Sequence, residues 1–173
     1  MKIFSMRGEI SLLHIVILFV VLMTAFCFLY PKYQWKQMKT RFTAAVTAGD
    51  ALYQNALAYY YNKSVWPSAM SDLEVPKGAK RLSDWEILDD LYTCEMAYGR
   101  GDKIQNDIIC SPTGKFAKTI SYQIVLGDLR ASKRLCRASK DDENANKLCQ
   151  LLGGKYSHTL AGTRPPLLIY TFK

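Results

Sequence analysis

The chain has 173 residues, of which 49% are hydrophobic, and a formal net charge of +8 at pH 7. This length suits one domain beyond an N-terminal anchor. The content of Tyr, Phe and Trp is high enough for a hydrophobic core, which excludes a fully disordered polar chain. No GxSxG, HExxH, P-loop or paired-carboxylate pattern occurs, and His158 is the only histidine beyond the apolar N-terminal segment. We therefore expect no catalytic activity, no metal site and no cofactor.

Residues 10–30 form a run of 21 residues without a formal charge. As a helix that rises about 1.5 Å per residue, the run covers roughly 30 Å, the thickness of the hydrocarbon core of a bilayer. A cleaved signal peptide has a shorter apolar region of about 7 to 15 residues, followed by small residues at the cleavage site. The stretch from Phe28 to Pro31 is a poor cleavage site. The run therefore predicts a transmembrane helix, either as a plain signal anchor or as the first half of a longer helix.

The helical pattern continues after Pro31, since proline fits the first turn of a helix and kinks a helix that already exists. Apolar residues then recur at steps of three and four, which marks one apolar stripe. The stripe contains Trp35, Met38, Phe42, Val46, Gly49, Leu52 or Tyr53, Ala56 or Leu57, and Tyr60. The opposite face carries Lys36, Lys39, Arg41, Asp50 and Asn55. We expect one helix of roughly 55 residues, with a transmembrane half over residues 9–31 and an amphipathic half over 32–63.

Residues 64–173 are predicted to form the globular domain on which the amphipathic half packs. Turn signals over residues 66–85, among them Trp66-Pro67 and Gly78, predict a connecting loop with a short turn of helix at 71–74. A first β-hairpin pairs residues 91–98 with 106–110 across a turn at 99–102.

A second hairpin is predicted from residues 119–126 and 131–138, which a turn at Gly127-Asp128 connects. The alternation in its first strand places four large apolar side chains on one face. These are Ile120, Tyr122, Ile124 and Leu126.

A short helix and a last strand complete the predicted fold. Ser139 at the N-cap and Asp142 three residues later fit a capping box, and the helix is expected to run to Leu152 and to close at Gly153-Gly154. Residues 167–172 are predicted to form the final strand. The fold class is therefore α+β, with a long N-terminal helix packed on a small antiparallel β-sheet.

Five cysteines are present, and Cys27 lies inside the apolar run, where it behaves as a small apolar residue. The other four allow three disulfide connectivities, of which sequence-local pairing is the simplest: Cys94 with Cys110 and Cys136 with Cys149. Such bridges imply an oxidising compartment outside the cytoplasm. The basic residues argue the other way, because Lys32, Lys36, Lys39 and Arg41 follow the run closely and only Lys2 and Arg7 precede it. We give the cysteines more weight.

The flanks of the apolar run resemble the type IV pilin and type II secretion pseudopilin family. Residues 1–8 form a short basic leader that ends in Gly8, and Pro31-Lys32-Tyr33-Gln34 is similar to the Pro-x-Tyr-Gln exit of the family helix. Trp66-Pro67 and the cysteine-bearing C-terminal half, with residues 145–149 in an ANKLC-like helix, resemble bacterial pilin-like subunits. The resemblance covers the whole architecture and implies that a prepilin peptidase cuts between Gly8 and Glu9, with methylation of the new N-terminus.

Two positions depart from the family pattern. Glu9 would be the first mature residue, where members usually carry Phe or Met, and Leu13 occupies the fifth mature position, where members usually carry Glu. In the family that Glu is thought to meet the terminal amine of the neighbouring subunit and to set its register. Some minor pseudopilins at filament tips lack it, so the departures are compatible with a subunit of that kind.

The resemblance implies a structural subunit of a type IV pilus (a fimbrium) or a type II secretion pseudopilus. It would be anchored in the bacterial inner membrane by a single pass, with its C-terminal domain outside the cytoplasm, and would polymerise with other pilin-like subunits. Two alternatives stay open. One is a minor pilin that binds DNA through a basic C-terminal face, because residues 111–173 hold 11 Lys and Arg against four acidic residues. The other is a plain signal-anchored extracytoplasmic protein.

Overall fold

The computed structural model describes residues 12–98, 106–127 and 133–172. The chain divides into two compact units, Met1–Gln37 and Met38–Lys173. The expected cleavage site at Gly8 and Glu9 and the turn at residues 99–102 lie outside the described residues, as does Asp128 of the second expected turn.

Helix α1 (Leu12–Lys63) contains both the apolar run and the amphipathic stretch, and it continues through Pro31. From Met38 onward its buried residues follow most of the expected stripe, but Val46 and Tyr60 are only half-buried, and Ala45 and Ala48 are buried although they were not part of it. The buried residues are Met38, Phe42, Ala45, Ala48, Gly49, Leu52, Tyr53 and Ala56. The helix ends where Ser64 takes a positive φ of 57° and donates its backbone N–H to the carbonyl oxygen of Tyr60 over 2.7 Å.

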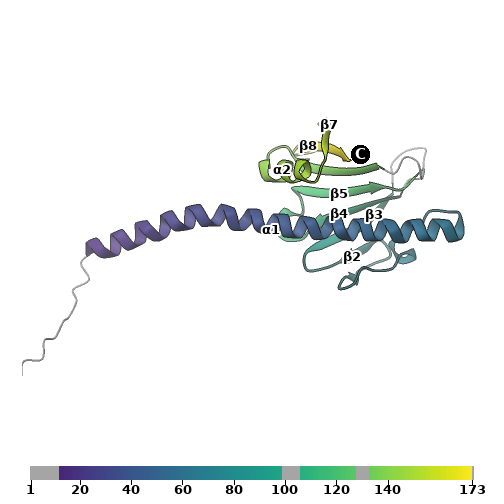
Figure 1. The fold of residues 1–173 in the computed structure, drawn as a ribbon, viewed down its shortest axis with the longest axis horizontal. Coiled ribbons are helices and arrows are strands. Elements are labelled where there is room, and N and C mark those ends of the chain that lie inside the picture. Colours follow the sequence, from purple (N-terminus) through teal and green to yellow (C-terminus); the bar gives the residue numbers. More distant parts are fainter. Residues whose placement is uncertain (1–11, 99–105, 128–132, 173) are drawn as a thin grey trace, which may run out of the picture. The chain divides into compact units, whose positions relative to one another are not determined.

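All described strands belong to one antiparallel sheet (Figure 1), which together with α1 confirms the α+β fold class. Its strands are β1 (Lys80–Arg81), β2 (Glu86–Leu88), β3 (Tyr92–Tyr98), β4 (Asn106–Pro112), β5 (Ile120–Val125), β6 (Lys133–Ser139), β7 (Lys155–Leu160) and β8 (Leu167–Phe172). Their spatial order is β1-β2-β3-β4-β5-β6-β8-β7, so β8 inserts between β6 and β7. Two 3₁₀ turns, η1 (Met70–Asp72) and η2 (Gly114–Phe116), and helix α2 (Glu143–Leu151) complete the fold.

The expected strands at 91–98, 106–110, 119–126, 131–138 and 167–172 correspond to β3, β4, β5, β6 and β8. Strands β1, β2 and β7 were not expected. β1 and β2 have only two and three residues, too few for a repeating pattern. β7 contains only two large apolar residues, Tyr156 and Leu160, and all six of its residues are exposed, so its sequence signal for a strand is weak.

The prediction that Ser139 caps the short helix is wrong. Ser139 ends β6, where its backbone N–H donates to the carbonyl oxygen of Thr119, and Asp142 is the N-cap of α2. The Asp142 carboxylate accepts the backbone N–H of Ala145, three residues into the helix, which is the bond that an N-cap residue makes. At the other end, Gly153 has a φ of 88° and the N–H of Gly154 donates to the carbonyl oxygen of Cys149, which closes a Schellman motif as expected.

One transverse row of paired residues lies at the centre of the sheet. Ile87 pairs with Cys94, Cys94 with Cys110, and Cys110 with Tyr122. The row continues through Cys136 to Tyr170. All of these residues are buried, because this is the face that the 38–63 part of α1 and helix α2 cover. We call it the core row.

Candidate functional site

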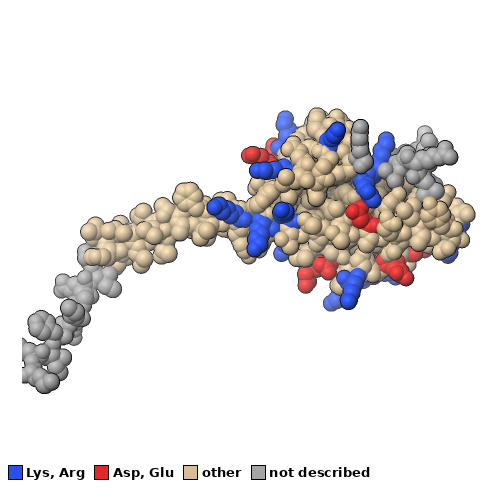
Figure 2. Space-filling model, viewed as in Figure 1, with Lys and Arg blue, Asp and Glu red and all other residues tan. Residues whose placement is uncertain are grey.

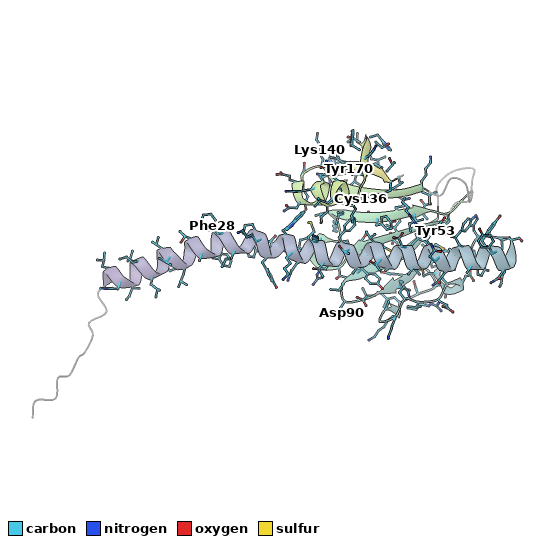
Figure 3. The ribbon with its side chains drawn as sticks, in the orientation of Figure 1. Phe28, Tyr53, Asp90, Cys136, Lys140 and Tyr170 are labelled. Atoms are coloured by element: carbon cyan, nitrogen blue, oxygen red, sulfur yellow. A yellow bond between two sulfur atoms is a disulfide. The ribbon has the colours of Figure 1, made fainter. Side chains whose placement is uncertain are left out.

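The most exposed apolar surface of the molecule is the first half of α1. Large apolar side chains over residues 12–30 are between 45% and 79% exposed. Figure 3 shows one of them, Phe28, projecting outward from the helix. No Lys, Arg, Asp or Glu occurs over residues 12–31, and this stretch is uncharged in the space-filling view (Figure 2). α1 is thus apolar on every side here, as helices surrounded by lipid or by protein are.

This stretch makes α1 the one helix of the described residues that is long and apolar enough to cross a membrane. Burial of a single Leu, Ile, Val, Phe or Met side chain is worth about 1.5–3 kcal/mol, so exposure of this many apolar side chains to water would be costly. Pro31 lies at its C-terminal end within the helix. The kink that we expect at Pro31 stays a prediction.

Both disulfides start from the core row. Cys94 and Cys110 are directly opposite each other on β3 and β4 and form one bridge, with Cα atoms 4.1 Å apart. Cys136 of β6 forms the other with Cys149 of α2. The structure therefore contains the sequence-local pairing, and the second bridge fastens α2 to the sheet. Cys27 is free and exposed on the apolar half of α1.

Gly49 brings α1 close to the core row. A Cβ at this position would lie 2.9 Å from Cδ1 of Tyr122, which is shorter than side chains tolerate, and 3.4 Å from the Cys110 sulfur, which is close to ordinary contact. The absence of a side chain lets the helix backbone rest on the Tyr122 ring and on the Cys94–Cys110 bridge. Gly49 thus belongs to the buried stripe for reasons of space.

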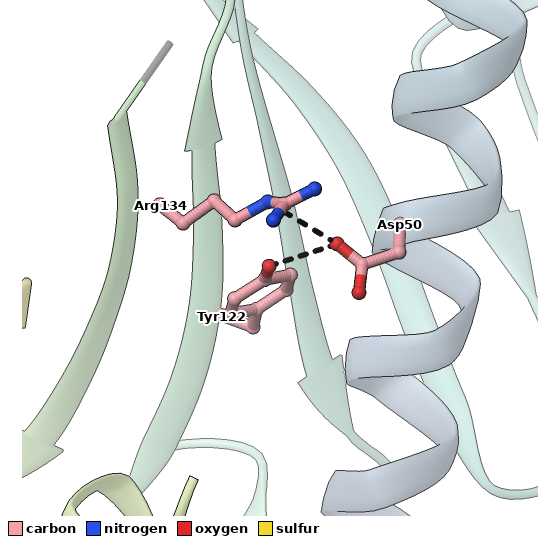
Figure 4. A network of polar contacts seen from close by, with 3 residues as sticks. All are labelled: Asp50, Tyr122 and Arg134. Carbon is pink, nitrogen blue, oxygen red and sulfur yellow. Dashed lines mark hydrogen bonds and ion pairs between the residues drawn. The ribbon is translucent and has the colours of Figure 1, made fainter. Parts of the chain in front are cut away.

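Asp50, Tyr122 and Arg134 form a polar cluster beside this contact (Figure 4). The hydroxyl of Tyr122 donates to Oδ1 of Asp50 over 2.9 Å, and Nε of Arg134 lies 3.5 Å from the same oxygen. The guanidinium of Arg134 also lies over the ring of Tyr53, 5.6 Å from its centroid. The cluster lines a hollow of about 230 Å³ together with Val46, Leu152 and Phe172. It connects α1 to β5 and β6.

Burial raises the pKa of the Tyr122 hydroxyl, and the neighbouring Asp50 carboxylate raises it further. The tyrosine therefore stays protonated and acts as a hydrogen-bond donor. With Asp50 and Arg134 each 43% exposed, the ion pair itself contributes little, so the buried Tyr122–Asp50 bond is the stronger link.

Arg41 provides a second polar link within the globular unit. Its guanidinium donates to the hydroxyl oxygen of Thr113 over 2.7 Å and to the Thr113 carbonyl oxygen over 3.1 Å. The Thr113 hydroxyl in turn donates to the carbonyl oxygen of Asp90. Asn55 donates to the carbonyl oxygen of Glu74. The prediction of a polar face on this half of α1 is therefore only partly right. Arg41, Asp50 and Asn55 lie at the margins of the apolar stripe, and each forms hydrogen bonds with residues outside α1.

A third polar cluster lies on the other face of the sheet, because Gln123 follows Tyr122 and so points the opposite way. Gln123 is 3% exposed and donates a hydrogen bond to Asp107. Burial raises the pKa of Asp107 and lowers the pKa of Arg137, while the attraction between these two groups acts against both shifts. Within the described residues, Asp107 Oδ1, Gln123 Oε1 and Arg137 Nε lack a hydrogen-bond partner.

The sequence did not single out the Asp50–Tyr122–Arg134 cluster. An acidic residue next to Gly49 at the edge of the apolar stripe was the only signal, and its partners are more than 70 positions away. Arg134 and Arg137 belong to the basic C-terminal excess, yet both face acidic residues of the chain. On the face that Figure 2 shows, Lys and Arg are spread over the globular unit. Across the described residues no group of three His, Cys, Asp or Glu could hold a metal ion.

Comparison with protein-family models, with curated proteins and with solved structures finds no match in any of the three. The fold agrees in outline with a pilin-like architecture: a long apolar N-terminal helix on a disulfide-bearing antiparallel sheet.

Proposed function

We propose that the protein is a structural subunit of a type IV pilus or a type II secretion pseudopilus, and that it acts by polymerisation and not by turnover. One observation carries the proposal. A single helix, α1, has an apolar half that is exposed on every side and a second half whose apolar stripe is already buried on the sheet. The apolar stripe of the second half is therefore already shielded from water by the sheet. The apolar surface of the first half would be shielded by other molecules.

Two environments can supply that cover in turn. Before assembly, residues 12–30 would cross the inner membrane, with the disulfide-bearing unit outside the cytoplasm. After assembly, the same residues would pack against their counterparts in neighbouring subunits. Both environments are apolar, so the exchange loses little hydrophobic stabilisation. Thr24 and Ala25 are small enough to let neighbouring helices approach closely.

The resemblance of the N-terminal segment supplies the first test. We expect a prepilin peptidase to remove residues 1–8 by cutting between Gly8 and Glu9. The full chain is co-expressed with an active prepilin peptidase, and its intact mass is measured. The expected result is the loss of the mass of residues 1–8, with an inactive peptidase and a Gly8→Leu chain as controls that keep the full mass. An unchanged mass with the active enzyme would favour the plain signal anchor.

A second test addresses polymerisation directly. Cys27 is the free cysteine of the chain and lies on the apolar half of α1. Single cysteines are placed in turn at positions 24 to 28 in a Cys27→Ala background, so that every side of the helix is sampled. Assembly predicts oxidative cross-linking of two copies in the membrane at a subset of these positions with a helical period. A chain that stays monomeric at all five positions would argue against polymerisation.

A further inference from the structure

The apolar half of α1 ends in a shallow hollow lined only by apolar and aromatic side chains. Phe26, Leu29, Tyr30 and Tyr33 surround a volume of about 400 Å³. Their spacing of three, four and seven residues places them on one side of the helix. The rings of Phe26 and Tyr30 stack with their centroids 5.1 Å apart, which forms one wall of the hollow.

Two lysines flank this hollow. Lys32 and Lys36 follow Leu29 by three and seven positions, so they lie along the edge of the hollow that Leu29 forms. Both side chains are exposed. A lysine can lay its aliphatic stem along an apolar surface and keep its ammonium group in the polar layer, so both charges can reach a group just beyond the hollow. The Tyr33 hydroxyl accepts a hydrogen bond from Gln37 Nε2 over 2.6 Å. The C-terminal end of the hollow therefore carries polar groups as well as the two lysines.

The charged residues of α1 beside the hollow are all basic. The sequence holds no Asp or Glu between Glu9 and Asp50. No acidic side chain of this stretch can therefore neutralise Lys32 and Lys36, which favours a partner that brings negative charge to the hollow.

The position of the hollow agrees with the dimensions of a bilayer. Residues 12–30 would cover about 28 Å as a helix, so Tyr30 and Tyr33 would lie near the level where acyl chains meet head groups. Tyrosine and lysine are the residues that favour this level. An acyl chain then lies at the depth of the hollow, and a phosphate at the depth of the two ammonium groups.

We propose that this surface is a binding site for an anionic phospholipid. One acyl chain lies along Phe26, Leu29, Tyr30 and Tyr33, and the phosphate lies between Lys32 and Lys36. The lipid belongs to the leaflet from which the chain continues toward residue 38. The inference depends on the membrane-spanning part of the proposed function and is independent of polymerisation.

The test uses the full chain in a mild detergent and titrates it with phosphatidylglycerol or phosphatidylcholine, with bound lipid counted by native mass spectrometry. A lysine near an anionic membrane surface favours binding by about five-fold, so the pair predicts a preference of about 25-fold for phosphatidylglycerol. In Lys32→Gln/Lys36→Gln the preference should disappear. In Lys118→Gln/Lys140→Gln, which removes two exposed lysines of the globular unit, it should stay. Tyr33→Ala should weaken the binding of both lipids, because it removes a wall of the hollow and keeps both charges.

Equal binding of the two lipids by the unaltered chain would overturn the inference. So would a preference that survives in Lys32→Gln/Lys36→Gln, or one that falls equally in the control pair, since diffuse charge and not a site would then explain it. Extraction of membranes with alkaline carbonate separates this failure from that of the proposed function. A chain that stays in the pellet without a lipid preference contradicts only the lipid site, whereas a chain released into the supernatant contradicts the anchor.

Discussion

The two halves of α1 have the same backbone conformation and opposite surroundings. In the Met1–Gln37 unit, Phe19 is 62% exposed, whereas in the Met38–Lys173 unit Phe42 is fully buried. The first half places apolar residues on every side of the helix. The second half confines them to one stripe and uses small residues such as Ala45, Ala48 and Gly49 where the sheet comes closest.

This difference indicates which contacts stabilise each half of the helix. Isolated helices are marginal in water, so each half depends on packing. The second half receives it from the chain itself, through the core row and the polar links of Arg41, Asp50 and Asn55. Under the proposed function, the first half would receive it from a bilayer or from other copies of the chain. Substitutions of matched type in the two halves should therefore have different effects.

The largest difference is expected between two phenylalanines. Phe42→Ala should lower the free energy of unfolding of the globular unit by about 3–5 kcal/mol, because it leaves a cavity in a packed core. Phe19→Ala should change it by less than about 0.5 kcal/mol. The measurement is urea denaturation of the full chain in a mild detergent, followed by near-ultraviolet circular dichroism. Equal losses for the two variants would contradict the separation into two units.

Cysteines provide the next comparison. Cys136→Ala/Cys149→Ala should lower the free energy of unfolding by roughly 3 kcal/mol, because the bridge closes a loop with a sequence separation of 13. Cys27→Ala on the apolar half should leave it unchanged. The midpoints of urea denaturation with and without a reducing agent check this result. If the double variant matched the unaltered chain under oxidising conditions, α2 would not depend on its bridge.

A smaller effect is expected at Gly49. Gly49→Ala gains about 1 kcal/mol of helix propensity but forces a Cβ against Tyr122, at a typical cost of 1–3 kcal/mol for overpacking, so we expect a net loss of about 1 kcal/mol. The same substitution in a Tyr122→Leu background, where the ring is gone, should be neutral or stabilising. A double-mutant cycle on urea denaturation gives the coupling energy. A coupling near zero would mean that the helix does not rest on the ring.

The effect that is smallest near neutral pH is the pH dependence of the Tyr122–Asp50 bond, which appears only in alkaline solution. Burial raises the pKa of Tyr122 in the folded protein, so above about pH 10 the unfolded chain loses a proton that the folded protein keeps. Stability should therefore fall as the pH rises above 10, by at most about 1.4 kcal/mol per pH unit from this group. Tyr122→Phe should remove that part of the slope and run parallel to the unaltered chain between pH 7 and 9. Identical slopes above pH 10 would contradict a buried, protonated tyrosine.

Much of the fold could be predicted because its signals are local. The stripe from Met38 to Ala56 has a period that only a half-buried helix gives, and Ile120, Tyr122, Ile124 and Leu126 alternate as a half-buried strand does. All four are buried, as expected. The cysteines were also informative. Cys94 and Cys110 lie on the two strands of one predicted hairpin, so only the register of that hairpin had to match for the two residues to lie opposite each other.

The parts that sequence could not supply depend on contacts between distant residues. Asp50 was expected to face solvent, yet Tyr122 and Arg134 reach it from β5 and β6, and nothing at position 50 indicates those partners. Arg41 reaches Thr113 because a long side chain can bend from the margin of the stripe toward the sheet. Strand β7 is held by its pairing with β8, and its own residues are all exposed and include only two large apolar side chains.

The two bridges on the core row also set how far the chain can be stretched. A pull on the two ends of an oxidised subunit bypasses the segments between Cys94 and Cys110 and between Cys136 and Cys149, whose sequence separations are 16 and 13. At about 3.5 Å per extended residue these segments have contour lengths of about 56 Å and about 46 Å. If such subunits form a fibre, its extension under load would come from the segments outside the two disulfide-closed loops. The contour length within those loops would become available only after the disulfides are reduced.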